Sequence, residues 1–231
     1  MNFIISGLSW FVLAALYLLL RIWPGSHSWT VLLMTGSGGV GKSTMHRHVL
    51  ECIPWIFGIP LDTTRAARGE DTSPFSDKRP IPEAAFRRRE RSKLYLHFET
   101  KSGRYGFSLL TVARELLRTG TVLVTVGDRP LIRRIKRFAE SCGFRAVCIG
   151  VVRDKELRRS TLRAAGVADA QIEERLGRDE ERFTPAHLAE VCDVIVTNNG
   201  SVDEFIGRFL RAATRYIRRD APIPLQVETT T

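Results

Sequence analysis

Short apolar runs alternate with amphipathic stretches along most of the chain. The apolar runs are rich in Val, Ile and Leu, as expected of strands buried on both faces of a parallel sheet. They predict strands at residues 30–34, 55–61, 94–98, 121–126, 146–152 and 194–197. The amphipathic stretches predict helices at residues 44–52, 83–91, 109–118, 131–141, 155–165, 170–181 and 202–218. Strands that alternate with helices indicate an α/β domain whose parallel sheet is covered on both faces.

The amino-terminal stretch follows a different pattern. Residues 3–20 are almost entirely apolar, close to the roughly 20 residues that a membrane helix needs. Arg21 closes the stretch, and Trp23 and Trp29 follow it. Interfacial aromatic residues and a first positive charge on this side favour a single-pass membrane anchor with the rest of the chain in the cytoplasm. A cleavable signal peptide is one alternative, although no basic segment precedes the stretch. A helix packed on its own domain in a cytoplasmic protein is the other.

A glycine-rich segment lies between the first predicted strand and the first predicted helix. It reads Gly36-Ser37-Gly38-Gly39-Val40-Gly41-Lys42-Ser43, followed by Thr44. The segment fits the pattern G-x-x-x-x-G-K-[ST], in which backbone N–H groups surround phosphate oxygens. Lys42 would reach the β- and γ-phosphates, and the Ser43 hydroxyl would bind Mg²⁺. We therefore expect the chain to bind ATP and Mg²⁺ through this segment.

Charge narrows the range of partners. Lys and Arg number 35 against 25 Asp and Glu, which gives a net charge of +10. Such a charge suits nucleic acid, an anionic membrane surface or small molecules that carry several phosphates. No nucleic-acid-binding module is recognisable, so we expect a small phosphorylated substrate and no nucleic acid. The four cysteines form no C-x-x-C pair, which indicates reduced thiols.

Residues 62–82 are polar and punctuated by Pro and Gly, which predicts irregular structure. Within this stretch, Arg65 and Arg68 stand three residues apart. Two arginine forks at this spacing can converge on one phosphate of an acceptor molecule. The alternative is a solvated pair of charges.

The order of motifs from about residue 30 to 210 resembles the guanylate kinase group of P-loop phosphotransferases. Besides the phosphate loop, the similar segments are Thr63-Thr64-Arg65-Ala66-Ala67-Arg68-Gly69-Glu70, Tyr105-Gly106 and Val194-Ile195-Val196-Thr197-Asn198-Asn199. The resemblance implies a P-loop three-layer sandwich over residues 28–218. It also implies a small acceptor-binding subdomain at about 62–106, in which Tyr105 contacts the acceptor, and a helical lid at about 153–182. The anchor and linker at 1–24 would precede this domain, and a flexible tail at 219–231 would follow it.

The acceptor segment departs from guanylate kinases at two positions. Leu61 stands where that group has a serine, and Leu96 stands where it has the glutamate that reads guanine. Leucine accepts no hydrogen bond, so guanine specificity is in doubt. The ribose 1,5-bisphosphate phosphokinase branch is more similar here, through residues 83–89 and through Gly127-Asp128-Arg129. This second resemblance implies that Asp128 and Arg129 also contact the acceptor.

The lid departs from the group as well. Its R-L-x-x-R-G motif appears as Thr161-Leu162-Arg163-Ala164-Ala165-Gly166 and lacks both expected arginines. Arg163 is one substitute, with Arg158 and Arg159 as others, and Arg175 keeps the second lid position of the group. Lid arginines can align the γ-phosphoryl group and neutralise its charge. The alternative is that each is a charge on the surface of a helix.

These observations predict an ATP-dependent kinase that acts on a small phosphate-bearing acceptor. The favoured acceptor is ribose 1,5-bisphosphate, which would give 5-phosphoribosyl diphosphate. A GMP kinase is the alternative within enzymes, and a catalytically weak, membrane-tethered scaffold is the alternative from another class.

Overall fold

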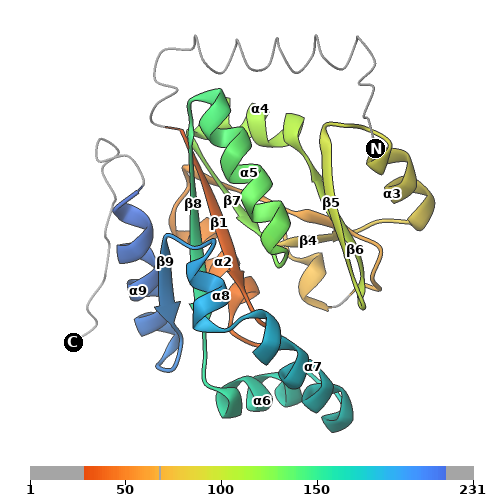
Figure 1. Ribbon diagram of the computed structural model, residues 1–231, viewed down its shortest axis with the longest axis vertical. Helices are drawn as coiled ribbons and strands as arrows, with labels where there is room; N and C mark the ends of the chain where they lie inside the picture. The colour runs from red at the N-terminus through yellow and green to blue at the C-terminus, as the bar shows by residue number, and fades with distance from the viewer. Residues whose placement is uncertain (1–28, 68, 217–231) are drawn as a thin grey trace.

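The centre of the protein is a five-stranded parallel sheet in the order β2–β7–β1–β8–β9 (Figure 1). The computed structural model describes residues 29–67 and 69–216. The strands of this sheet are β1 (Thr30–Gly36), β2 (Ile56–Ile59), β7 (Thr121–Thr125), β8 (Arg145–Val152) and β9 (Val194–Thr197). Every residue of β1 is buried, as expected for the middle strand of a covered sheet. The predicted α/β fold with a parallel central sheet is therefore confirmed.

Alternate residues of β1 pack into two separate cores. Val31 and Leu33 belong to a cluster with residues of α4 and α5, whereas Leu32 and Met34 belong to a cluster with residues of α2 and α9. The bounds of these helices are α2 Lys42–Cys52, α4 Leu109–Thr119, α5 Arg129–Cys142 and α9 Val202–Thr214. The sheet is thus the middle of three layers, and the carboxyl ends of its strands carry the loops that could bind a ligand.

A second, four-stranded sheet in the order β4–β3–β6–β5 lies beside the first (Figure 1). Its elements are β3 (Leu61–Thr63), β4 (Lys78–Pro80), β5 (Tyr95–Thr100) and β6 (Gly103–Ser108), with the 3₁₀ turn η2 (Gly69–Thr72) and helix α3 (Glu83–Glu90). The strand predicted at 55–61 was wrong as one element, because the chain leaves β2 at Pro60 and enters β3. Proline has no N–H to continue the ladder. Residues 62–82 are also more regular than predicted, since β4 pairs with β3.

A buried carboxylate holds the second sheet together. Asp62 is almost inaccessible to solvent, and its carboxylate accepts hydrogen bonds from Arg79 Nε at 2.7 Å, from Arg89 Nη1 and from the Tyr95 hydroxyl at 2.9 Å. Burial and the nearby charge of Asp62 raise the pKa of Tyr95, so its hydroxyl stays a proton donor. A buried charge needs such partners, and these three come from β4, α3 and β5.

Two helices, α6 (Lys155–Ala164) and α7 (Asp169–Arg182), lie within the range predicted for the lid. They enclose a small apolar cluster of their own, formed by Leu162, Ile172 and Leu176. Helix α8 (Pro185–Ala189) follows and was not predicted. The lid range thus has a core that is separate from the two cores of the central sheet.

The predicted membrane anchor at 3–20 and the predicted tail at 219–231 lie outside the described residues. No helix among the residues that the structure describes combines the length and the apolar character needed to cross a bilayer. The anchor therefore stays a prediction.

Candidate functional site

The glycine-rich loop lies at the carboxyl end of β1 and leads directly into α2. Gly41 precedes α2 with a φ of 95°, a left-handed conformation that favours glycine. Asn198, which follows β9, donates from Nδ2 to the carbonyl of Val40 at 2.8 Å. The loop is thus fixed by the segment that follows β9, the edge strand of the same sheet. The free N–H groups at the start of α2 point where an anion would be stabilised.

A cleft of about 340 Å³ opens at this loop. Its walls come from three parts of the chain: the loop, the second sheet and helix α7. Predicted site residues that line it are Gly36, Gly38, Gly39, Lys42, Ser43, Arg65, Tyr105 and Arg175. Residues far apart in sequence, including the phosphate loop, Arg65 and Arg175, therefore face one space.

Among the predicted residues of the loop, Ser37, Val40, Gly41 and Thr44 do not line this cleft. Outside the loop, three predicted site residues do not line it either. The Arg163 side chain is 60% exposed and pairs with Asp169 at 2.9 Å. Asp128 instead caps helix α5 by accepting from the backbone N–H of Leu131 at 2.9 Å. Arg129 points to Glu190, with 3.6 Å between the two groups. Arg68 lies outside the described residues.

The ammonium of Lys42 is turned onto its own loop. Its Nζ donates to the carbonyl of Gly36 at 2.9 Å and to that of Ser37 at 2.6 Å. Burial, together with the positive charge of Lys78, lowers the pKa of Lys42 to about 8. An anion in the cleft would offer a stronger partner than two carbonyl groups, because charge-assisted hydrogen bonds are about twice as strong as neutral ones.

The lid contacts the phosphate loop at Gly38. Asp179 of α7 accepts from the N–H of Gly38 at 2.8 Å and from Arg158 Nη2 at 3.0 Å. Arg158 Nε donates to the Gly38 carbonyl at 3.0 Å. Both backbone polar groups of Gly38 are therefore bound by side chains of α6 and α7. The sequence analysis named Arg158 only as a substitute for a lost lid arginine and missed Asp179.

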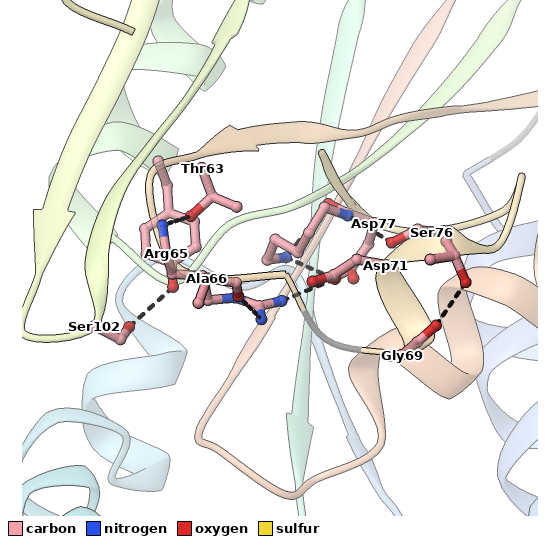
Figure 2. Close-up of polar contacts among 11 residues, drawn as sticks. Thr63, Arg65, Ala66, Gly69, Asp71, Ser76, Asp77 and Ser102 are labelled. Atoms are coloured by element: carbon pink, nitrogen blue, oxygen red, sulfur yellow. Dashed lines mark hydrogen bonds and ion pairs between the residues drawn. The ribbon is translucent and has the colours of Figure 1, made fainter. Parts of the chain in front are cut away.

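On the opposite wall, Arg65 is paired with a carboxylate (Figure 2). Its Nη2 lies 2.9 Å from Asp71 Oδ1, and Nη1 donates to the carbonyl of Ala66 at 3.2 Å. The side chains of Arg65 and Asp71 are only 9% and 2% exposed. The guanidinium is thus held in a fixed direction, and a ligand phosphate would compete with Asp71 for it.

Aromatic and hydroxyl groups line the outer end of the cleft. Phe98 and Tyr105 stack with their ring centres 5.4 Å apart, and the Tyr105 hydroxyl lies 2.9 Å from that of Ser102. Phe98 pairs with Tyr105 across β5 and β6. Leu96 does not line the cleft and is buried in a core cluster. The sequence comparison therefore pointed to Leu96, whereas Phe98 is the β5 side chain beside Tyr105.

The sequence analysis did not single out several polar residues that line the cleft. These are Asp77, Lys78, Thr100, Lys101, Ser102, Thr125, Arg178, Asp179 and Arg182. Lys and Arg residues outnumber the two carboxylates among all lining residues, so the cleft suits a ligand with several negative charges. Lys101 also bridges the hairpin of β5 and β6 to Glu174 of α7 at 2.7 Å.

Asp77 is a buried carboxylate between the two walls. It is 5% exposed, and Lys78 Nζ lies 2.6 Å from its Oδ2. Burial opposes ionisation of Asp77, but the charges of Lys78, His46 and Lys42 hold its pKa below the ordinary value. The only signal in the sequence was a charged pair inside a stretch that predicted irregular structure.

Hydroxyl and carboxylate oxygens lie around Ser43. Hard oxygen groups of this kind suit a Mg²⁺ ion that arrives with a nucleotide. A second cavity of about 30 Å³ adjoins the cleft and is lined by Ser43, Thr44, Arg47, Ser73, Phe75, Ser76 and Asp77. Among the described residues, no group of three or more His, Cys, Asp and Glu side chains could hold a metal by itself. A metal here would thus need phosphate oxygens and water among its ligands.

Comparison with solved structures identifies the fold. A guanylate kinase from Anaplasma phagocytophilum is 15% identical, covers 83% of this chain and 88% of its own, and superposes with a TM-score of 0.58. A fungal RNA kinase is 10% identical over 81% of this chain and 85% of its own, with a TM-score of 0.46. No protein-family model matches the chain, and no curated protein matches it. The resemblance to the guanylate kinase group is confirmed at the level of the fold, and the ribose 1,5-bisphosphate branch stays a prediction.

Proposed function

We propose that this protein is an ATP-dependent phosphotransferase that transfers the γ-phosphoryl group to a small phosphate-bearing acceptor. The favoured acceptor is ribose 1,5-bisphosphate, and the product is then 5-phosphoribosyl diphosphate. One observation carries the proposal: Lys42 and Ser43 of the phosphate loop face the same cleft as Arg65 and Tyr105 of the second sheet. Donor and acceptor phosphates bound on these two walls would meet in the space between them.

The donor wall supplies charge and position. Lys42 would leave the carbonyl groups of its own loop and bind the β- and γ-phosphates, while backbone N–H groups of the loop bind phosphate oxygens. The Ser43 hydroxyl would hold Mg²⁺, which supplies further neutralisation of phosphate charge when it is bound. Phosphoryl transfer needs alignment and charge stabilisation more than covalent chemistry from the protein.

The lid would supply the remaining positive charge. Arg175 lines the cleft together with Arg178 and Arg182, spaced along one helix. These three side chains can neutralise oxygens of the phosphoryl group as it is transferred and can exclude water from it. They support a catalytic lid, even though Thr161 and Ala165 stand where the guanylate kinase group has arginines.

The acceptor wall favours a sugar phosphate over a purine nucleotide. A site that reads guanine needs hydrogen-bond acceptors placed for the ring N–H groups. In the described part of the cleft the carboxylates are Asp77 and Asp179, both engaged by cations near the phosphate loop. The outer end instead offers the rings of Phe98 and Tyr105 with nearby hydroxyls. Arg65, Lys78 and Lys101 provide cations for more than one phosphate.

Steady-state kinetics with purified protein tests the proposal. ADP release with Mg·ATP is measured against ribose 1,5-bisphosphate, GMP and other nucleoside monophosphates, and the phosphorylated product is identified by mass. We expect ribose 1,5-bisphosphate to give the highest kcat/KM. Efficient phosphorylation of GMP would replace the acceptor and favour the GMP kinase. ATP binding without turnover of any acceptor would favour a membrane-tethered scaffold.

A further inference from the structure

P-loop enzymes hold Mg²⁺ with the loop Ser or Thr and with a carboxylate from a neighbouring strand. In this protein the neighbours of β1 are β7 and β8. Strand β7 ends at Thr125, and the carboxylate that follows it, Asp128, caps helix α5. Strand β8 is followed by Asp154, which does not line the cleft. Neither neighbouring strand therefore delivers a carboxylate to the phosphate loop.

Asp77 brings a carboxylate to the loop from the other subdomain. It precedes β4 of the second sheet, yet it lines both the cleft and the small cavity on either side of Ser43. The volume of about 30 Å³ in the small cavity accommodates roughly two water-sized occupants. Hydroxyl groups of Ser43, Thr44, Ser73 and Ser76 line it with Asp77. These are the oxygen donors that a hydrated Mg²⁺ ion prefers.

Bound phosphates make an isolated carboxylate unfavourable at this position. Asp77 is nine-tenths or more buried and close enough to Lys42 and Lys78 for their charges to affect its ionisation. A triphosphate in the loop would draw both ammonium groups toward its own oxygens, and two buried anions that face one another repel strongly. A divalent cation between Asp77 and the phosphates removes this repulsion. Lys78, at 2.6 Å, is the cation that neutralises Asp77 in the ligand-free protein.

We propose that Asp77 is a metal-binding residue, which holds the Mg²⁺ of the bound nucleotide together with Ser43. The inference rests on the proposed function, because it requires nucleotide in the phosphate loop. The metal site is then assembled from two subdomains: Ser43 belongs to the central domain and Asp77 to the second sheet. Metal binding would in this way draw the acceptor wall toward the donor wall.

Direct binding of ADP to the full chain, with Mg²⁺ and with EDTA, tests the inference. The readout is the factor by which Mg²⁺ tightens ADP binding, measured by calorimetry. Asp77→Asn keeps the shape of the side chain and should reduce this factor by about 10–100-fold, the scale seen when support for a bound metal is lost. Affinity for ADP in EDTA should stay the same or rise. Asp154→Asn changes the carboxylate that follows β8 outside the cleft and should leave the factor unchanged.

Lys78→Gln provides a second variant, with the opposite expected result. It removes the cation that competes for Asp77, so the tightening by Mg²⁺ should increase. A full Mg²⁺ effect in folded Asp77→Asn, equal losses with Mg²⁺ and EDTA, or no increase in Lys78→Gln would each overturn the inference. Failure of the wild-type protein to bind ADP under either condition would instead overturn the proposed function, and this inference with it.

Discussion

In the proposed reaction the two walls of the cleft would bind anions by different means. The donor wall is one continuous segment, in which backbone N–H groups and Lys42 follow directly from a buried strand. The acceptor wall is built from side chains of separate elements, and its cations already have partners, such as Asp71 for Arg65 and Asp77 for Lys78. The backbone of the donor wall is thus formed before a ligand arrives, apart from Lys42 and the α6 and α7 groups on Gly38, whereas the acceptor wall must exchange ion pairs for phosphate.

This difference has an energetic consequence. A phosphate that binds Arg65 gains a charge-assisted hydrogen bond but displaces one of similar strength. Only a ligand that contacts several groups at once offsets the free energy lost when these ion pairs break. The acceptor wall is therefore selective. Under the proposed function, backbone N–H groups of the donor wall would bind phosphate oxygens, which all nucleoside triphosphates share, and would not distinguish one base from another.

The largest effect should follow a change in the donor wall. Lys42→Ala removes the one side-chain cation within the loop and should reduce ATP turnover by about 10²–10³-fold, on the scale of losing one transition-state donor. Steady-state ADP release measures the effect, and circular dichroism should show an unchanged fold. Lys155→Ala is the matched control, since Lys155 pairs with Glu180 on the lid and does not line the cleft. Full turnover in folded Lys42→Ala would contradict the kinase proposal.

The next largest effect should be a loss of folding stability at acid pH, caused by a buried histidine in helix α2, which follows the phosphate loop. His46 of α2 is fully buried, with its Nε2 unpartnered in the described structure and close to Gly58. Burial lowers its pKa from 6.5 to about 4, a change that the charge of Asp77 opposes and that of Lys78 assists. The pKa of His46 is lower in the folded protein than in the unfolded protein. The stability that depends on the neutral, buried imidazole is therefore present above pH 6.5 and is lost as the pH falls toward 4.

A shift of this size corresponds to roughly 3 kcal/mol of unfolding free energy at pH 4. Denaturant melts between pH 7 and 4 measure the loss, and His46→Gln should flatten the pH profile. His97→Gln, at an exposed position on β5, is the control and should keep the wild-type profile. An equally steep profile in His46→Gln would show that other groups cause the acid sensitivity.

A smaller effect, confined to one substrate, should follow a change in the acceptor wall. Arg65→Ala should raise the KM of the acceptor by about 10–100-fold and leave that of ATP nearly unchanged, because one charge-assisted bond contributes about 1.5–3 kcal/mol. Arg163→Ala, on the lid surface outside the cleft, should change neither KM. An equal rise of both KM values in Arg65→Ala would show that the two walls are not independent.

The same contrast explains what the sequence could predict. The phosphate loop, its strand and its helix follow from adjacent residues, so local pattern was enough. Asp77 and Asp179 lie beside the loop although they are far from it in the chain, as the 141-residue separation of Gly38 and Asp179 illustrates. No periodicity or motif brings such residues together. Their placement depends on the packing of subdomains.

Short segments account for the other differences. Strands β3 and β4 have three residues each, too few to show a period. They exist because they pair with one another and because β3 also pairs with β6. Asp128 and Arg129 matched a motif by type, but at this position the carboxylate caps a helix and the guanidinium lies near Glu190. Residue identity alone did not place these two side chains at the cleft, because the local backbone directs them to other partners.

The contact between Asp179 and Gly38 makes the lid an internal ligand of the phosphate loop. Its carboxylate is tethered through α7, so its effective concentration at the loop stays high at every protein concentration. The apparent affinity for nucleotide equals the intrinsic affinity scaled by the fraction of molecules in which that N–H group is vacant. Coupling of this kind is reciprocal. Under the proposed function, a nucleotide that takes the N–H group would release Asp179 and free α7 from this contact with the loop.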